Sequence, residues 1–194
     1  TVDGRQELVA ITDGPVEVRA VYLPEPDRLV VDLPGATLAT DWRVMPMDGV
    51  VMHQLRVSGE QGGVRLVADL TAPTGYTLLP AEEHPGFVVR LNHQLREVSA
   101  APAEEGLMAL EAAVSGGPIL YQAFVLREPW RVVVDLFDVT VSAPLDLQLD
   151  QGGVKAVRVS QFRQDAARIV LELQEPVEWP ASPMSGQAHP GPDG

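Results

Sequence analysis

Three pairs of arginines, separated by nearly the same interval, are the polar side chains best suited to hold a ligand. The first pair is 103 residues apart (131 − 28 = 103). The pairs are Arg28 with Arg131, Arg56 with Arg158, and Arg65 with Arg168. A guanidinium binds a carboxylate through two parallel hydrogen bonds. These arginines could therefore hold an acidic ligand group, or they could pair with acidic residues on neighbouring strands and organise a sheet surface.

Arg56 and Arg158 are the preferred ligand contacts, and Arg28 and Arg131 are further candidates. Neither Arg56 nor Arg158 has an acidic residue at the strand positions that follow it. Arg28, in contrast, lies on one strand face with Asp32, four residues later. Three tryptophans are candidate platforms for a sugar ring, namely Trp42, Trp130 and Trp179.

The sequence predicts no catalytic centre, no metal site and no cofactor. The histidines do not recur between the two halves of the chain; they are His53, His84, His93 and His189. The pairs Glu82-Glu83 and Glu104-Glu105 are adjacent, and adjacent residues of a strand point to opposite faces. The chain has no cysteine and no Gly-x-Ser-x-Gly turn to present a nucleophile.

The composition restricts the classes of fold and of binding partner that this chain can have. Seventeen glycines and seventeen prolines disfavour helices and favour short strands joined by turns. A net charge of -13 argues against nucleic acid as a partner, because phosphate binding needs clustered basic residues. No apolar run reaches the ~18 residues that a membrane helix requires, so we expect no membrane insertion.

An internal repeat predicts two similar all-β domains. The run Arg28–Leu33 (RLVVDL) recurs as Arg131–Leu136 (RVVVDL), and the turn at Gly14-Pro15 recurs at Gly117-Pro118. Such self-similarity indicates duplicated structural units. The predicted organisation is a first β-sandwich domain at 1–92, a connector at 93–103, a second β-sandwich domain at 104–180 and a disordered linker at 181–194.

Short runs of β-branched and aliphatic residues, bounded by Gly, Pro, Asp or Asn, locate the strands. In the first domain we expect strands near 6–12, 16–23, 28–33, 50–57, 64–70, 75–79 and 86–91. In the second domain we expect strands near 106–114, 118–126, 131–137, 153–160, 167–173 and 176–179. The segment Gln161–Ala166 is expected to be a loop.

The first copy resembles the AMIN domain. The resemblance rests on Arg28–Ala36 (RLVVDLPGA), the step Leu55-Arg56-Val57, and Val64–Leu70 (VRLVADL). In the second copy, Val157–Phe162 (VRVSQF) is close to the family pattern. Phe137-Asp138-Val139 departs from it, where the family usually has a turn similar to Pro-Gly-Ala.

The resemblance implies a function in the cell envelope. AMIN domains accompany periplasmic or secreted N-acetylmuramoyl-L-alanine amidases and type IV pilus secretins, where they are thought to direct the protein to peptidoglycan. We therefore expect a non-catalytic, wall-associated module in the periplasm or outside the cell, whose predicted C-terminal linker leads to a larger parent protein. The alternatives are the periplasmic domains of a secretin, or a structural β module that binds another envelope protein.

Overall fold

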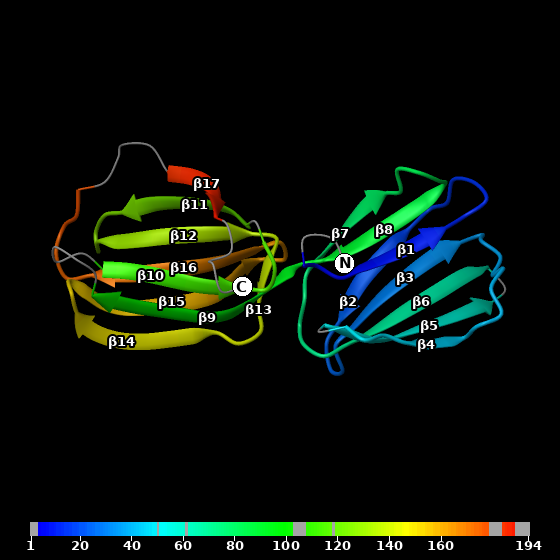
Figure 1. Ribbon diagram of the computed structural model, residues 1–194, viewed down its shortest axis with the longest axis horizontal. Helices are drawn as coiled ribbons and strands as arrows, with labels where there is room; N and C mark the ends of the chain where they lie inside the picture. The colour runs from blue at the N-terminus through cyan, green and yellow to red at the C-terminus, as the bar shows by residue number, and fades with distance from the viewer. Residues whose placement is uncertain are drawn as a thin grey trace. The chain divides into compact units, whose positions relative to one another are not determined.

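The computed structural model describes residues 4–49, 51–60, 62–102, 108–117, 119–178 and 184–188. The chain divides into two compact units. Unit 1 contains Gln6–Leu91, and unit 2 contains Asn92–Gly194 together with Asp3–Arg5. Each unit combines a large and a small β-sheet (Figure 1). The described residues form strands and no helix. The predicted all-β fold with two tandem β domains is confirmed.

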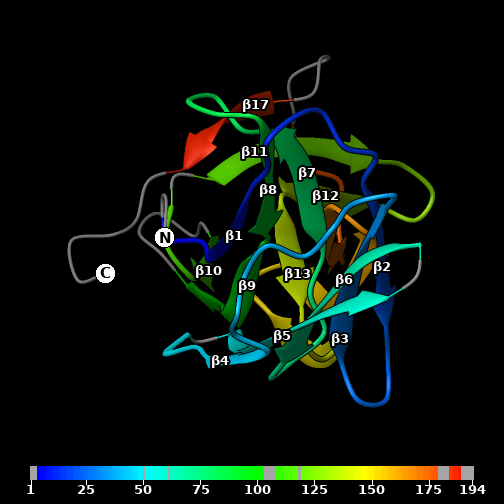
Figure 2. The same cartoon turned by 90° about the vertical axis from the view of Figure 1, so that its right-hand side faces the viewer.

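Unit 1 consists of a five-stranded and a three-stranded antiparallel sheet. Its strands are β1 (Glu7–Ile11), β2 (Arg19–Leu23), β3 (Arg28–Pro34), β4 (Val44–Pro46), β5 (Met52–Glu60), β6 (Gly63–Leu70), β7 (Tyr76–Pro80) and β8 (Gly86–Leu91). The large sheet has the order β2-β3-β6-β5-β4, and the small sheet has the order β1-β8-β7. Figure 2 shows the two sheets of this unit as separate layers.

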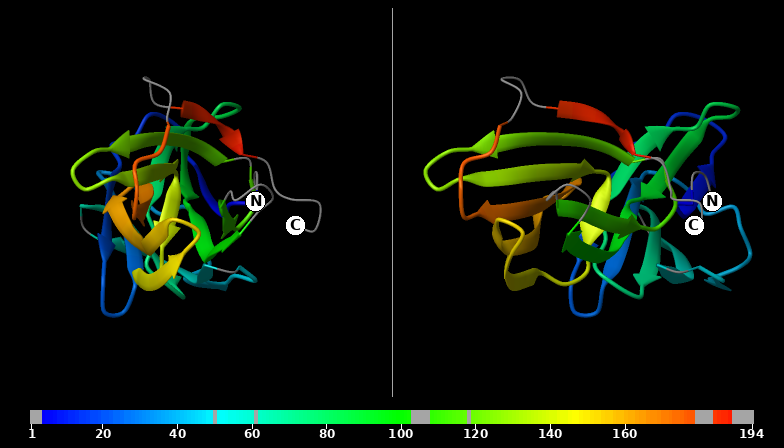
Figure 3. Two further views of the ribbon diagram at one scale, coloured as in Figure 1. Left: turned by 90° about the vertical axis from the view of Figure 1, so that its left-hand side faces the viewer. Right: turned by 60° about the vertical axis from the view of Figure 1, so that its left-hand side comes forward.

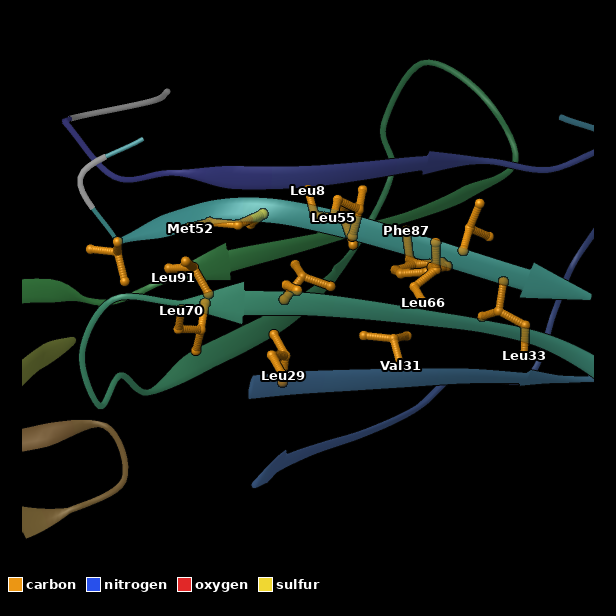
Figure 4. Close-up of a cluster of buried hydrophobic side chains, with 14 of the residues drawn as sticks. Leu8, Leu29, Val31, Leu33, Met52, Leu55, Leu66, Leu70, Phe87 and Leu91 are labelled. Atoms are coloured by element: carbon orange, nitrogen blue, oxygen red, sulfur yellow. The ribbon is translucent and has the colours of Figure 1, made fainter. Parts of the chain in front are cut away.

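The core of unit 1 lies between its two sheets because side chains alternate along each strand. In β6, Val64, Leu66 and Leu70 are buried, whereas Arg65 points away from the core. The small sheet contributes Leu8 from β1 and Phe87, Val89 and Leu91 from β8 to the same cluster (Figure 4). The interior is therefore mainly aliphatic, as the valine- and leucine-rich strands require.

Unit 2 has a six-stranded large sheet and a three-stranded small sheet. Its strands are β9 (His93–Pro102), β10 (Met108–Val114), β11 (Ile119–Leu126), β12 (Arg131–Phe137), β13 (Val139–Val141), β14 (Leu145–Gln151), β15 (Val154–Arg163), β16 (Ala166–Leu173) and β17 (Met184–Ala188). The large sheet has the order β14-β15-β16-β12-β11-β17, and the small sheet has the order β10-β9-β13. Figure 3 shows β17 beside β11 at one edge and β14 at the other.

The two large sheets share one plan. In unit 1, β3 pairs with β2 and β6; in unit 2, β12 pairs with β11 and β16. The turn between β2 and β3 contains a cis peptide bond before Pro26, and the turn between β11 and β12 contains one before Pro129. The register repeats as well, because Asp32 lies opposite Arg65 and Asp135 lies opposite Arg168. The sequence repeat thus corresponds to a structural repeat.

Several predicted boundaries are wrong. The expected connector at 93–103 contains β9, which pairs with β10 and β13 in unit 2. The expected linker at 181–194 contains β17, and the rest of that segment lies outside the described residues. The expected loop Gln161–Ala166 is a tight hairpin, because β15 continues to Arg163 and β16 begins at Ala166. Residues 176–178 form no strand.

Three other strands were not expected from the sequence, namely β4, β13 and β14. Two of them have only three residues each, too few for alternation to be recognised. β14 is an exposed edge strand, and its leucines alternate with Asp and Gln, a strand pattern that the prediction missed. These short or peripheral strands extend the sheets without changing the shared plan of the two units.

Replacing Leu29 by alanine should lower the free energy of unfolding by about 2–5 kcal/mol, because it removes a core side chain that is 1% exposed. The matched control is Ile11→Ala, at a side chain that is 71% exposed in the same unit. That change should cost less than about 0.5 kcal/mol. Urea unfolding followed by circular dichroism measures both, and equal losses would contradict the assigned core.

Candidate functional site

The outer face of each large sheet, which points away from the core, carries the repeated arginines. Along β3, Arg28 and Asp32 lie on this face, while Leu29 and Leu33 point inward. The same alternation places Arg131 and Asp135 on the outer face of β12. Strand periodicity therefore brings the charged residues of three neighbouring strands onto one surface in each unit.

At the centre of each outer face, an arginine forms an ion pair with an aspartate on the neighbouring strand. We name this ion pair the central pair. In unit 1, Arg65 donates from Nε and Nη2 to Asp32 at 2.6 and 3.0 Å. In unit 2, Arg168 donates from the same two atoms to Asp135 at 2.6 and 2.8 Å. The hydrogen bond from Arg65 lowers the pKa of Asp32, and the hydrogen bond to Asp135 raises the pKa of Arg168.

Beside the central pair of unit 1 lies a second group of charges, the flanking cluster of Arg28, Arg56 and Asp69. Arg56 donates from Nε and Nη2 to Asp69 at 2.8 and 2.6 Å. Asp69 lies opposite Arg28 in the β3–β6 register. Asp69 therefore lies on the strand between the two arginines, and the hydrogen bond from Arg56 lowers its pKa.

The flanking cluster of unit 2 consists of Arg131, Arg158 and Glu172. Arg158 donates from Nη1 to Glu172 at 3.0 Å and from Nε to Asp146 at 3.0 Å. Glu172 lies opposite Arg131, and the Lys155 ammonium is 3.6 Å away from its carboxylate. Two cations, Arg158 and Lys155, thus contact one carboxylate here, and Asp146 is the second acidic partner of Arg158.

The four predicted site residues are therefore brought together in two pairs, one in each flanking cluster. The expectation that Arg56 and Arg158 lack acidic partners is wrong, because Asp69, Glu172 and Asp146 reach them from neighbouring strands. Both arginines nevertheless remain open to solvent, with side chains 42% and 49% exposed.

Each flanking cluster also keeps donors that no described residue uses. Within the described part of the chain, Nη1 of Arg56 and Nη2 of Arg158 have no hydrogen-bond partner. The Nε of Arg131 is buried and likewise has no partner among the described residues. Arg28 donates from Nε to the Pro26 carbonyl at 3.4 Å. The spare donors of the exposed Arg56 and Arg158 side chains suit a carboxylate or carbonyl oxygen of a ligand.

Unit 2 adds a feature that the sequence reasoning missed. Phe124, Phe137 and Phe162 gather around Arg163 and Arg168 on its outer face, and we name these five residues the Phe–Arg cluster. The Arg168 guanidinium lies 3.4 Å from the centroid of Phe162 and 5.9 Å from that of Phe124. Arg163 lies 5.4 Å from Phe162 and 5.9 Å from Phe137. These are cation–π contacts.

The tryptophans that seemed suited to a sugar lie elsewhere. Trp42 packs against the core of unit 1, and Trp130 lies beneath Arg127 at 5.4 Å from guanidinium to ring centroid. Trp179 lies outside the described residues. A signal for the phenylalanines was available, because Phe124 and Phe137 occupy the positions of Val21 and Pro34 in the first copy.

The histidines stay apart in the structure. His53 is exposed and His84 is half-buried, while His93 is buried and its Nδ1 contacts the Ser115 carbonyl. His189 lies outside the described residues. Within the described residues, no three His, Asp or Glu side chains are grouped so as to hold a metal ion. Nor do those residues include a helix that is long and apolar enough to cross a membrane.

Comparison with known proteins decides the family. The model of the AMIN domain matches residues 2–91 and 110–190, which covers both copies of the repeat. The chain belongs to the AMIN domain family. It is also similar to the N-acetylmuramoyl-L-alanine amidase AmiC of Escherichia coli O6:H1 strain CFT073, with 35% identity over 69 residues. This match covers 33% of the AMIN chain and only 16% of the amidase.

The pairing of Arg56 with Asp69 predicts a pH-dependent contribution to stability. The pKa of Asp69 is lowered below 3.8 in the folded protein, so its ionised form stabilises the fold above that pH. This contribution is lost as the pH falls through the folded pKa. The melting temperature of wild type should exceed that of Asp69→Asn at about pH 6, and the difference should shrink below about pH 4. A constant difference across this range would contradict the ion pair.

Proposed function

We propose that this AMIN pair is a non-catalytic peptidoglycan-binding module that localises an attached N-acetylmuramoyl-L-alanine amidase to the cell wall. The observation that carries the proposal is the match of both copies to the AMIN family, together with the likeness to an amidase. The place of action is then the periplasm or the cell exterior, where peptidoglycan lies. Cleavage of the wall is assigned to the attached domain.

Local contacts, not the overall field, must provide the binding. The chain has a net charge of -13, and peptidoglycan is itself partly anionic, so long-range attraction is unfavourable. The flanking clusters offset this repulsion locally with exposed guanidinium groups. Arg56 and Arg158 would donate to the carboxylates of a stem peptide or lactyl group, with Arg28 and Arg131 beside them.

The existing ion pairs help these arginines to recognise a ligand. Asp69 fixes the plane of Arg56, and Asp146 with Glu172 fixes that of Arg158. A guanidinium that is already oriented loses less conformational entropy when it binds. The free edge of each guanidinium is thereby presented in a constant direction on the outer face.

Sedimentation with insoluble sacculi tests the proposal. Wild type should sediment more strongly with sacculi than with chitin, whose sugars carry no carboxylate. The double variant Arg56→Ala/Arg158→Ala should bind sacculi about tenfold more weakly, because charge-assisted hydrogen bonds are lost. Each variant's thermal unfolding is measured alongside, since Asp69 and Glu172 lose a partner.

The matched control is Arg19→Ala, which removes one positive charge from the outer face of unit 1 without touching a flanking cluster. It should sediment like wild type. If folded wild type does not sediment, wall binding is overturned and an envelope protein becomes the partner to seek. If Arg19→Ala and the double variant lose the same affinity, a general charge effect replaces the proposed contacts.

A further inference from the structure

Unit 2 places most of the chain's phenylalanines on a solvent-facing surface. The chain has four phenylalanines, and only Phe87 belongs to a hydrophobic core. The other three lie in the Phe–Arg cluster, on the outer face of the large sheet. Phe162 is 44% exposed, and Leu120 and Leu126 of β11 on the same face are also exposed. An exposed aromatic group of this kind is a feature of binding surfaces.

The cluster is held in place by a buried ion pair. Asp135 is only 5% exposed and binds Arg168 through two hydrogen bonds. Arg168 in turn lies over the ring of Phe162. Phe162 itself is the extra residue of a β-bulge, where the β15–β16 register shifts between Gln161 and Arg163. A bulge redirects a side chain, and here it directs Phe162 onto Arg168.

The first copy shares the ion pairs but lacks the rings. Val21 and Pro34 stand where unit 2 has Phe124 and Phe137, and β5 ends in Gly59-Glu60 where β15 continues into Phe162. Each copy has a central pair, so the pair alone does not require the rings. The aromatic surface is therefore a property of unit 2 and not of the common fold.

Charge distinguishes the Phe–Arg cluster from the flanking cluster next to it. Both of its arginines are paired, Arg168 with Asp135 and Arg163 with Asp165 at 3.6 Å, so its formal charge is balanced. The flanking cluster, in contrast, has Arg131 and Arg158 with Glu172, and Lys155 and Asp146 lie beside it as further charged neighbours. A balanced aromatic surface with N–H donors suits a neutral ligand that has an apolar face and a polar edge.

We propose that the Phe–Arg cluster stacks against a neutral N-acetylated sugar ring of a peptidoglycan glycan strand, so that unit 2 reads the glycan as well as the acidic groups attached to it. This inference rests on the proposed function. The axial C–H groups of a pyranose would lie on Phe162, and the arginines would donate to its hydroxyl or acetamido oxygens. Asp135 and Arg131 are four residues apart on β12, or about 13 Å, so sugar and carboxylate contacts lie along one face.

Titration of the full chain with soluble glycan strands tests the proposal, with chemical-shift changes as the readout. The strands are freed of their stem peptides and amidated at the lactyl carboxylates, so that they carry no charge. Wild type should bind these strands, and Phe162→Ala should weaken binding about tenfold. Phe162→Tyr keeps the ring and should restore affinity. Arg158→Ala should leave this affinity within about twofold, because the amidated ligand has no carboxylate. Ile11→Ala is the control for loss of an exposed apolar side chain.

The outcomes separate this inference from wall binding itself. If wild type sediments with sacculi but does not bind peptide-free glycan, sugar stacking is overturned while the proposed function stands. If Phe162→Ala binds glycan like wild type, the Phe–Arg cluster is not the contact. If wild type binds neither sacculi nor glycan, both proposals fail. The melting temperature of Phe162→Ala should stay close to that of wild type, because the ring is largely outside the core.

Discussion

The pairing of Arg65 with Asp32, repeated as Arg168 with Asp135, joins the two central strands of each large sheet across its outer face. Side chains alternate along a strand, so a slip of one residue would move these charges into the aliphatic core and the valines and leucines into water. Burial of the inner residues and pairing of the outer ones therefore favour the same register. Every other feature of the outer face depends on that register, including the spacing of the flanking clusters.

The two units use this common frame differently. Around Asp69, unit 1 has arginines and an aliphatic outer surface that includes the exposed Val21. Unit 2 adds aromatic rings and a third cation, Lys155, next to Glu172. Duplication preserved the residues that fix strand register, whereas the residues placed on top of the frame diverged. The two units therefore carry chemically different surfaces on the same sheet plan.

Strong strands were predictable from the sequence because their apolar residues alternate and their turns contain Gly or Pro. The RLVVDL and RVVVDL runs located β3 and β12, and their acidic ends indicated cross-strand pairing. The partners of Arg56 and Arg158 were not predictable, because Asp69 and Glu172 come from other strands and only the register brings them near. β9 was missed because its Ala- and Pro-containing end is typical of a connector.

The Phe–Arg cluster depends on a bulge and on contacts between strands far apart in sequence, so no local pattern reveals it. The second copy has phenylalanine at the positions of Val21 and Pro34, which identifies two residues of the cluster. It does not indicate that these two side chains gather around Arg163 and Arg168. Alternation along a strand predicts which face a residue occupies, while the neighbours it meets there follow from the pairing of several strands. The candidate site was therefore predictable as a surface and not as a set of contacts.

The place of β9 has a consequence for how the second half of this protein can be isolated. In unit 1, the partner of β1 is β8, which follows it near the other end of the unit; in unit 2, the partner of β10 is β9, which precedes it. The sequence repeat and the folded unit are thus offset by one strand. A fragment cut at the repeat boundary near residue 104 would lose Leu95 from its core and leave β10 without β9. The compact unit that contains β10 begins at Asn92 and also includes Arg5, so the boundary of the sequence repeat and the boundary of the folded unit differ.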